Sequence, residues 1–280
     1  MKRIIIITSI ALTLFTMQVP AQTKRALVIG IGEQEDCSWV NINGDKDVPY
    51  VKEMLIRFGY NDITTLINKQ ATKAGIVSAF KKLTRRCKEG DMIYIHFSGH
   101  GQQVTDVNGD EWPDTLDEAW IPYDAYLKYD AKHYKGENHL IDDEINTLLT
   151  NIRNRIGPDG ALLVVVDACH SGGSTRGEDI GETVRGVFDV FEIPGRHKGK
   201  SNKMAEQWLT LSACKDYQLN QEMKSPQLGR LTYALYCITE NDNVTMESIV
   251  AFMQRNRGRY PQTPVLSGDT ITHTISEFLR

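Results

Sequence analysis

Blocks of apolar and polar positions alternate along the chain and predict strands and helices in turn. Three short runs of Val, Ile and Leu end abruptly in Gly or small polar residues, as strands buried on both faces of a parallel sheet do. These runs cover residues 24–31, 91–97 and 161–166. Apolar residues at helical spacing predict helices at 47–58 and 73–88, on either side of a further strand at 62–68.

The order strand, helix, strand, helix, strand predicts an α/β domain, because helices that connect parallel strands cover the faces of the sheet. The second half of the chain continues this pattern less regularly. Its expected elements are strands at 118–122 and 207–213, helices at 141–149, 231–238 and 246–253, and an irregular edge piece at 262–266. We therefore expect one α/β/α sandwich with a mostly parallel central sheet, and no second core.

The first 21 residues have a different pattern. Basic Lys2 and Arg3 precede an apolar run over 4–17, and the small residue Ala21 follows. This is the pattern of a secretory signal peptide cut after Ala21, with an uncleaved anchor helix as the alternative. Residues 1–21 are thus expected to be removed, 22–280 to form the exported domain, and 174–205 to form a flexible linker within it.

The composition is that of a globular protein, with 41% hydrophobic and 24% charged residues among 280. The net charge of -4 gives no reason to expect nucleic acid or an anionic membrane as a partner. Gly30 and Gly32 suggest a dinucleotide fingerprint, but the third Gly is missing and acidic residues follow, which would repel a pyrophosphate. Five cysteines are an odd number, so at least one is expected to remain unpaired in an exported protein.

Two strand ends carry chemistry. Cys169 follows the run at 161–166, and His100 follows the run at 91–97. Carboxyl ends of parallel strands meet at one edge of a sheet, and adjacent strands lie about 5 Å apart. A thiol with a nearby imidazole is the pair that acyl transfer by cysteine requires, and the N–H groups around Gly101 and Cys169 would bind the oxyanion. The plainer interpretations are a buried structural thiol and a loop histidine.

These residues resemble a known family. Ser98-Gly-His-Gly101 and Asp167-Ala-Cys-His-Ser-Gly172 are similar to the motifs of caspase-like cysteine peptidases, and closer to metacaspases than to animal caspases. The acidic segment 103–124 and the block 212–218 also resemble metacaspase sequences. The resemblance implies a caspase-like fold and peptidase activity on protein or peptide substrates.

The resemblance also implies roles for single residues. His100 matches the catalytic histidine, Cys169 the nucleophile, and Asp167 and Ser98 the S1 pocket; Asp47 matches a second pocket acid, although the spacing over 41–47 departs from the family's. Carboxylates in a pocket select a cationic side chain, so Arg or Lys is expected at P1. No basic residue stands beside these motifs in the sequence.

No cofactor is required for this chemistry, but many metacaspases need calcium. Asp117, Asp142 and Asp143 match its ligands, and Glu178 or Asp179 would supply a fourth. The spacing of Asp106, Asn108 and Asp110 also resembles the opening of an EF-hand-like loop, although Glu111 replaces the usual Gly. Whether calcium is needed stays open at this point.

Other chemically active side chains have plainer interpretations. His96 is expected in the core or on a sheet face and not as a zinc ligand, because residues four apart share a face only on a helix. His170 is expected in a turn and Cys214 in the packed interior, and Asp216 is expected near the pocket as a helper residue.

The basic stretch over 185–203 is either a solvated linker or a site of self-processing, with cuts between Arg176 and Lys203. The sequence as a whole predicts an exported, monomeric cysteine endopeptidase that cleaves after Arg or Lys and processes itself as a zymogen. The alternatives are a peptidase of the same fold with another P1 preference, and a non-catalytic binding or scaffold domain.

Overall fold

The structure, a computed structural model, describes residues 22–106, 116–169, 183–187, 189–194, 207–240 and 243–280. The expected signal peptide and most of the expected linker lie outside these described residues. None of the described helices has the length and apolar character to cross a membrane.

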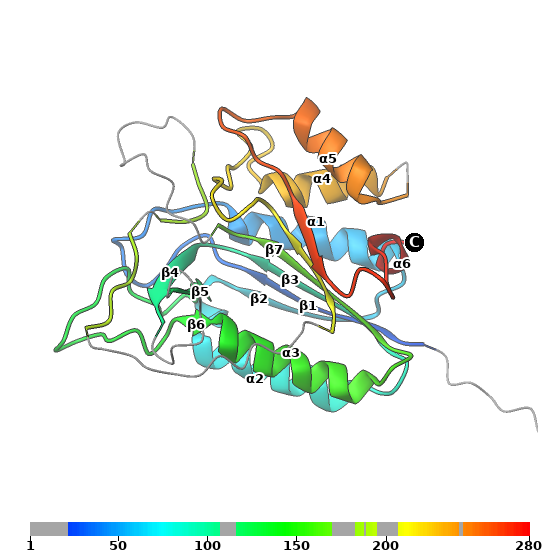
Figure 1. Ribbon diagram of the computed structural model, residues 1–280, viewed down its shortest axis with the longest axis horizontal. Helices are drawn as coiled ribbons and strands as arrows, with labels where there is room; N and C mark the ends of the chain where they lie inside the picture. The colour runs from blue at the N-terminus through cyan, green and yellow to red at the C-terminus, as the bar shows by residue number, and fades with distance from the viewer. Residues whose placement is uncertain (1–21, 107–115, 170–182, 188, 195–206, 241–242) are drawn as a thin grey trace, which may run out of the picture.

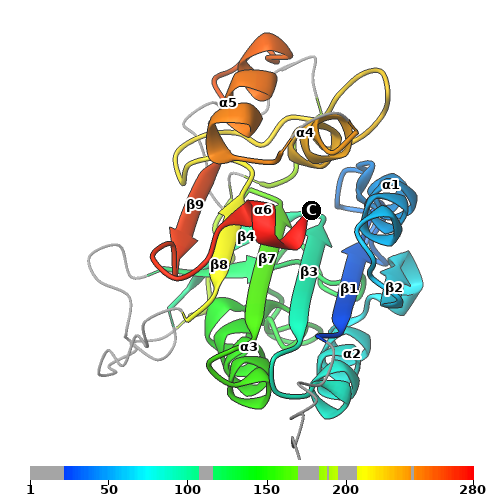
Figure 2. The ribbon, with the colours of Figure 1, turned by 90° about the vertical axis from the view of Figure 1, so that its right-hand side faces the viewer.

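A central sheet of six strands organises the chain (Figures 1 and 2). Its order is β2 (Asp62–Ile67), β1 (Lys24–Gly30), β3 (Met92–Ser98), β7 (Ala161–Asp167), β8 (Leu209–Ser212) and β9 (Val265–Gly268). Every neighbouring pair is parallel except β8 and β9, which are antiparallel. The predicted α/β architecture with a mostly parallel sheet is therefore confirmed.

Helices cover both faces of the sheet (Figure 1). One face carries α1 (Gly44–Arg57), α4 (Arg230–Ile238), α5 (Met246–Arg255) and α6 (Ile275–Phe278); the other carries α2 (Lys73–Arg86) and α3 (Asp142–Ile156). A short 3-10 helix, η1 (Asn68–Gln70), joins β2 to α2.

Strand β7 shows why the apolar runs are continuous. Leu163 and Val165 pack into the cluster that contains α1 and α4, whereas Leu162 and Val164 pack into the cluster that contains α2 and α3. All four side chains are at most 1% exposed. Because each such side chain contributes about 1.5–3 kcal/mol when buried, a strand between two layers needs apolar residues at every position.

A second, three-stranded sheet was not predicted. It is antiparallel and contains β4 (Gly101–Thr105), β5 (Leu116–Trp120) and β6 (Leu140–Ile141). No strand was expected between His100 and residue 118, but β4 begins directly after His100. The sequence of β4 is polar, and its pairing with β5 depends on main-chain hydrogen bonds that side-chain pattern does not reveal.

Several boundaries also differ from those expected. The helix expected at 47–58 begins at Gly44, and the helix expected at 141–149 extends to Ile156. The strand expected at 118–122 lies at Leu116–Trp120, and the edge piece expected at 262–266 is β9 at Val265–Gly268. Element ends are set by main-chain partners in the sheet or helix, so they carry the weakest sequence signal.

Helix α1 begins against the ends of two central strands. A Cβ on Gly44 would lie 2.5 Å from the carbonyl oxygen of Ile31 and 2.6 Å from that of Ser98, so only glycine fits there. This close approach brings Asp47, in the first turn of α1, beside the carboxyl end of β3. The start of a helix and two strand ends thus converge at one edge of the sheet.

Candidate active site

The sheet brings the two expected catalytic residues to neighbouring strand ends. Strands β3 and β7 are adjacent, with Ser98 opposite Asp167. His100 and Cys169 each follow two residues later, so both lie at the carboxyl edge of the central strands, where open α/β sheets hold their ligands. Both side chains are buried, with 1% and 2% exposed.

His100 is held in one tautomer by the main chain. Its Nε2 lies 2.7 Å from the carbonyl oxygen of Val40, which can only accept, so Nε2 carries the proton and Nδ1 is left as the acceptor. Nδ1 is buried and has no hydrogen-bond partner among the described residues. Burial lowers the pKa of His100 to about 4, against the bond to Val40, so the ring is neutral at pH 7. Trp39 fixes the ring plane from the side, at 5.0 Å between centroids.

The Cys169 thiol shares its surroundings with a second thiol. Its Sγ donates to the carbonyl oxygen of Gln218 at 3.0 Å, and Sγ of Cys214 approaches the same oxygen at 3.4 Å. Contact with Cys169 and burial together raise the pKa of Cys214 far above its ordinary value, so this second thiol stays protonated. All five cysteines lie in the described part of the chain and are free thiols there.

The three residues expected to form the S1 pocket do come together. Asp47, Ser98 and Asp167 are all fully buried, and the Ser98 hydroxyl donates to Asp47 at 2.7 Å. Asp47 also accepts from the Gly229 N–H at 3.0 Å. Asp167 accepts from the N–H and hydroxyl of Thr232 at 2.9 and 2.7 Å, and from the Asn220 amide at 2.7 Å.

A basic side chain of the same chain lies in this acidic pocket. Arg185 is fully buried, and its Nη1 lies 2.6 Å from Asp47, 3.4 Å from Ser98 and 3.5 Å from Asp167. Its Nε lies 3.0 Å from Oε1 of Glu222. A Cβ on Gly229 would overlap both this guanidinium and Asp167, so glycine there leaves room for the cation. No sequence motif pointed to Arg185 as a pocket residue.

Arg185 and the carboxyl groups around it shift one another's pKa values. Burial acts to lower the pKa of Arg185, but Asp47, Asp167 and Glu222 raise it well above its ordinary value. Burial raises the pKa of Asp167, but the charge of Arg185 and the hydrogen bonds from Asn220 and Thr232 together hold that pKa below its usual range. For Asp47 burial wins, and despite Arg185 its pKa is raised to about 6. Of the two aspartates that contact the cation, Asp167 is therefore firmly ionised, whereas Asp47 is more readily protonated.

A neutral histidine, His96, contacts two hydroxyl groups of the pocket. His96 is fully buried, in agreement with the expectation of a core position, and burial lowers its pKa to about 4. Its Nε2 lies 3.1 Å from the hydroxyls of both Ser98 and Thr232, and its Nδ1 lies 3.3 Å from the Tyr94 hydroxyl. Since the two hydroxyls donate to Asp47 and Asp167, their lone pairs are free to accept from His96.

The segment that carries Arg185 pairs with the protein as an added strand. The Arg185 N–H donates to the carbonyl oxygen of Asn220 at 2.9 Å, and the Glu222 N–H donates to that of Thr183 at 2.9 Å. Val184 and Gln221 form the antiparallel bridge between these two bonds. This is how peptides bind by strand addition, with main-chain bonds at alternate residues.

The carbonyl group of Arg185 lies at the nucleophile. Its oxygen accepts a hydrogen bond from the Cys169 N–H at 2.7 Å. The next residue, Gly186, bridges to Gly101 on β4, and Phe191 bridges further along β4 to Val104. The peptide bond between Arg185 and Gly186 therefore lies between the two main-chain groups that were expected to bind the oxyanion.

Sequence reasoning missed four residues of this site: Arg185, Asn220, Glu222 and Thr232. Arg185 was expected only as part of a basic stretch. Asn220 and Glu222 lie in irregular chain, and Thr232 lies on α4. Asn220 and Thr232 contact Asp167 across 53 and 65 residues, and Arg185 contacts Asp47 across 138 residues. The pairing of residues 183–185 with 220–222 places three of them, and this pairing between distant segments leaves no local sequence pattern.

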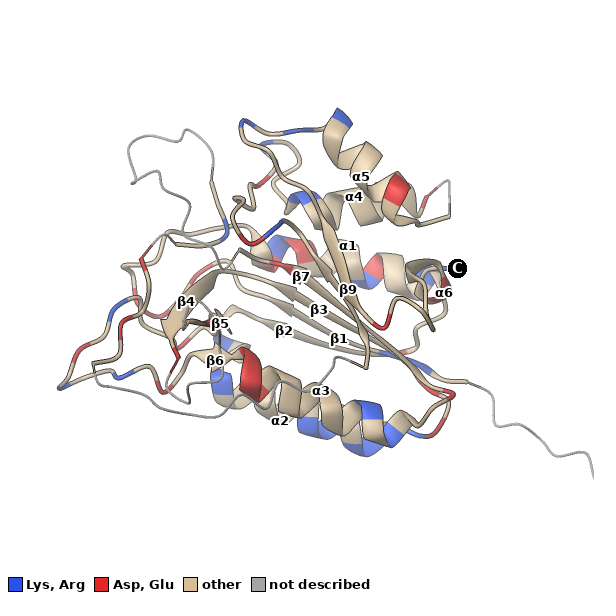
Figure 3. Ribbon diagram, in the orientation of Figure 1, with Lys and Arg blue, Asp and Glu red and all other residues tan. Residues whose placement is uncertain are grey.

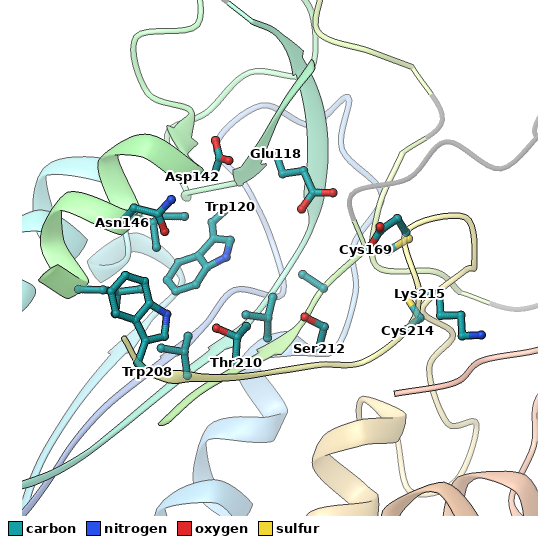
Figure 4. A pocket seen from close by; sticks show the side chains of 16 residues that line it. Glu118, Trp120, Asp142, Asn146, Cys169, Trp208, Thr210, Ser212, Cys214 and Lys215 are labelled. Atoms are coloured by element: carbon teal, nitrogen blue, oxygen red, sulfur yellow. The ribbon is translucent and has the colours of Figure 1, made fainter. Parts of the chain in front are cut away.

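A cavity of about 120 Å³ lies on the other side of Cys169, toward α3 (Figure 4). Trp120 and Trp208 stand on its apolar side, and Cys169, Cys214 and Lys215 lie together at its rim. Asp142 and Glu118 also line it. One hollow thus connects the nucleophile with an acid expected to bind calcium.

The expected calcium ligands lie close to one another along the small sheet. Asp117 precedes Ala119, which pairs with Ile141, and Asp142 follows directly at the start of α3. The acidic first turn of α3 faces the small sheet and its basic last turn points away (Figure 3). In the described part of the chain, however, no three acidic, His or Cys residues are arranged to hold a metal ion. Glu178 and Asp179, one of which was expected to supply a fourth ligand, lie outside the described residues.

Solved structures give the class of fold. Caspase-1 of Spodoptera frugiperda superposes with a TM-score of 0.58 over 89% of both chains, at 10% identity, which shows a caspase-like fold alone. A protein of Geobacter sulfurreducens, GSU0716, superposes with a TM-score of 0.65 at 25% identity, over 92% of this chain and 97% of that one.

Sequence comparison gives the family. The model of the metacaspase, peptidase C14 domain matches residues 24–176, more than half of the 280 residues. The chain therefore belongs to the metacaspase family of C14 peptidases, as the motifs had suggested. Members of this family are cysteine peptidases.

Curated relatives agree with this family. Metacaspase-1 of Plasmodium falciparum (isolate 3D7) is 28% identical over 92% of this chain and 41% of its own length. Metacaspase-7 of Arabidopsis thaliana is 33% identical over 57% of this chain and 38% of its own length. The chain thus aligns with well under half of each of these relatives.

Proposed function

We propose that this protein is a cysteine endopeptidase that cleaves after Arg or Lys, with Cys169 as nucleophile and His100 as general base. The observation that carries the proposal is the binding of the chain's own Arg185. Its guanidinium lies among Asp47, Ser98 and Asp167, and its carbonyl oxygen accepts from the Cys169 N–H. A cationic P1 side chain and a scissile carbonyl require these same contacts.

The reaction follows from the tautomer of His100. Nδ1 takes the thiol proton, and the thiolate of Cys169 attacks the P1 carbonyl carbon. The oxyanion accepts from the N–H groups of Cys169 and Gly101, and His100 returns the proton to the leaving amine as the C–N bond breaks. Water, deprotonated by His100, then hydrolyses the thioester and restores the thiol.

The same contacts support self-processing between Arg185 and Gly186, inside the range expected from the sequence. Until that bond is cut, Arg185 blocks the pocket, so the intact chain is a zymogen. In the uncut chain the thiol donates to Gln218 and burial keeps His100 neutral, so both partners are in the uncharged form. Cutting the bond would release Arg185 from Gly186 and free the pocket.

Three further properties stay predictions. Export after cleavage near Ala21 rests on the sequence pattern of residues 1–21, and the monomeric state is an expectation. Calcium stimulation rests on the family resemblance of Asp117, Asp142 and Asp143, and on the cavity that Asp142 shares with Cys169. No step of the reaction above passes through calcium.

Reporter peptides with Arg, Lys, Asp or Asn at P1 test the proposal. Wild-type protein and Cys169→Ala would be incubated with and without calcium, and the chain examined by mass spectrometry. We expect hydrolysis after Arg and Lys, and fragments that end at Arg185, in the wild type only. Cleavage after Asp with none after Arg would contradict the P1 assignment, and activity that survives in Cys169→Ala would contradict the nucleophile.

A further inference from the structure

Glu222 contributes to the pocket without having been expected there. Glu222 is 3% exposed, and Asn43, just before α1, holds both oxygens of its carboxylate. Oε1 accepts from the Asn43 N–H at 2.7 Å, and Oε2 accepts from the Asn43 side-chain amide. A carboxylate held in this way cannot move to bond a substrate whose hydrogen-bond donor lies at another position.

The three guanidinium nitrogens of Arg185 have different partners. Nη1 contacts Asp47, Ser98 and Asp167. Nη2 has no hydrogen-bond partner among the described residues. Nε contacts Glu222 at 3.0 Å.

Only the last of these contacts distinguishes arginine from lysine. The ammonium group of a lysine is a mobile point charge that can approach Asp47 and Asp167 in place of Nη1. At the position of the arginine Nε, however, lysine has a methylene group, which cannot donate. With lysine bound, Oε1 of Glu222 would keep the hydrogen bond from the Asn43 N–H but would face that methylene in place of the arginine Nε–H. The loss of this second, charged donor in a buried site costs binding energy.

We propose that Glu222 is the residue that makes this pocket prefer arginine over lysine at P1. The inference rests on the proposed cleavage after basic residues and makes it narrower. Asp47 and Asp167 supply the negative charge that attracts either cation. Glu222 then favours the one cation that has an N–H group in the middle of its side chain.

The ratio of kcat/KM for Arg and Lys reporters measures this preference. Every protein compared would first be cut between Arg185 and Gly186, which frees the pocket, and the cut would be verified by mass spectrometry. We expect a ratio of about ten to a hundred with Glu222 intact, which is the range for one hydrogen bond to a charged group. Glu222→Gln should lower kcat/KM for the Arg reporter and leave that for the Lys reporter within about threefold, so the ratio falls. The matched variant Asp47→Asn should lower kcat/KM for both reporters and keep the ratio.

Two further measurements avoid dependence on the folding of Glu222→Gln. With Glu222 intact, a P1 amidine in which a methylene replaces Nε–H keeps the positive charge and should be cleaved as slowly as the Lys reporter. In the uncut chain, Arg185→Lys should slow self-cleavage by the same factor as the reporter ratio.

The possible failures are distinct. If the protein cleaves neither Arg nor Lys reporters, both the proposed function and the role of Glu222 are overturned. If it cleaves both equally, or if the amidine is cleaved as fast as Arg, only the role of Glu222 is overturned. If Glu222→Gln lowers kcat/KM equally for the Arg and Lys reporters, the role of Glu222 is likewise overturned.

Discussion

Asp47 and Asp167 share one pocket and one cation, yet they respond differently to it. Asp167 accepts three hydrogen bonds, from Thr232 and Asn220, and the charge of Arg185 keeps its pKa low. Burial raises the pKa of Asp47 to about 6 even beside Arg185. Asp167 therefore provides permanent charge, and Asp47 is the carboxyl through which pH can control the binding of a basic side chain.

The activity should therefore depend on the protonation of Asp47. Below its pKa this carboxyl is neutral and cannot pair with a P1 cation, so cleavage after Arg weakens as the pH falls. The pKa of about 6 is the value with a guanidinium beside Asp47, as in the complex with a P1 Arg. We therefore expect kcat for Arg reporters to rise with pH and to level off near pH 6, and kcat/KM to fall at acidic pH as well.

Asp47→Asn tests this assignment, because it should remove this acid limb and lower kcat/KM at pH 8. The matched control is Asp45→Asn in the same first turn of α1, which does not contact Arg185 in the described structure and should keep the limb. An unchanged acid limb in Asp47→Asn would assign the titration to another group.

At the scale of elements, strand position was predictable and pocket composition was not. The apolar runs of β3 and β7 predicted two neighbouring buried strands, and their register confirms that Ser98 and Asp167 lie opposite each other. Glu222 and Asn220 lie in irregular chain after β8, where no periodicity fixes side-chain direction. Their position depends on the strand formed with Thr183 and Arg185, a pairing between segments that separately show no strand pattern.

That added strand predicts how a substrate's main chain is bound. The P1 N–H should donate to the Asn220 carbonyl, as the Arg185 N–H does, whereas the P2 residue occupies the place of Val184, which bridges Gln221 between the two hydrogen bonds. Methylation of the P1 nitrogen in an Arg reporter should lower kcat/KM on the order of tenfold or more. Methylation of the P2 nitrogen is the matched control and should have a smaller effect. Equal losses would contradict binding by strand addition.

At the scale of the whole molecule, the proposed cut lies in a connection and not in the core. Strands β1, β2, β3 and β7 precede Arg185, while β8 and β9 follow it. β7 and β8 are paired within the same sheet, and α1 and α4 pack in the same apolar cluster. The connection between β7 and β8 can therefore be opened without exposing the interior.

We accordingly expect the two fragments produced at Arg185 to stay together. On size-exclusion chromatography without denaturant, self-cleaved protein should elute as one species at the volume of uncut Cys169→Ala, and it should separate into fragments only in denaturant. The reason is that neither fragment can bury its half of the sheet alone, since Leu209 and Leu211 of β8 pack in the same cluster as Leu163 and Val165 of β7. Fragments that elute separately without denaturant would show that the connection, and not the shared core, holds the two halves in place, and activity would then disappear on cleavage instead of arising from it.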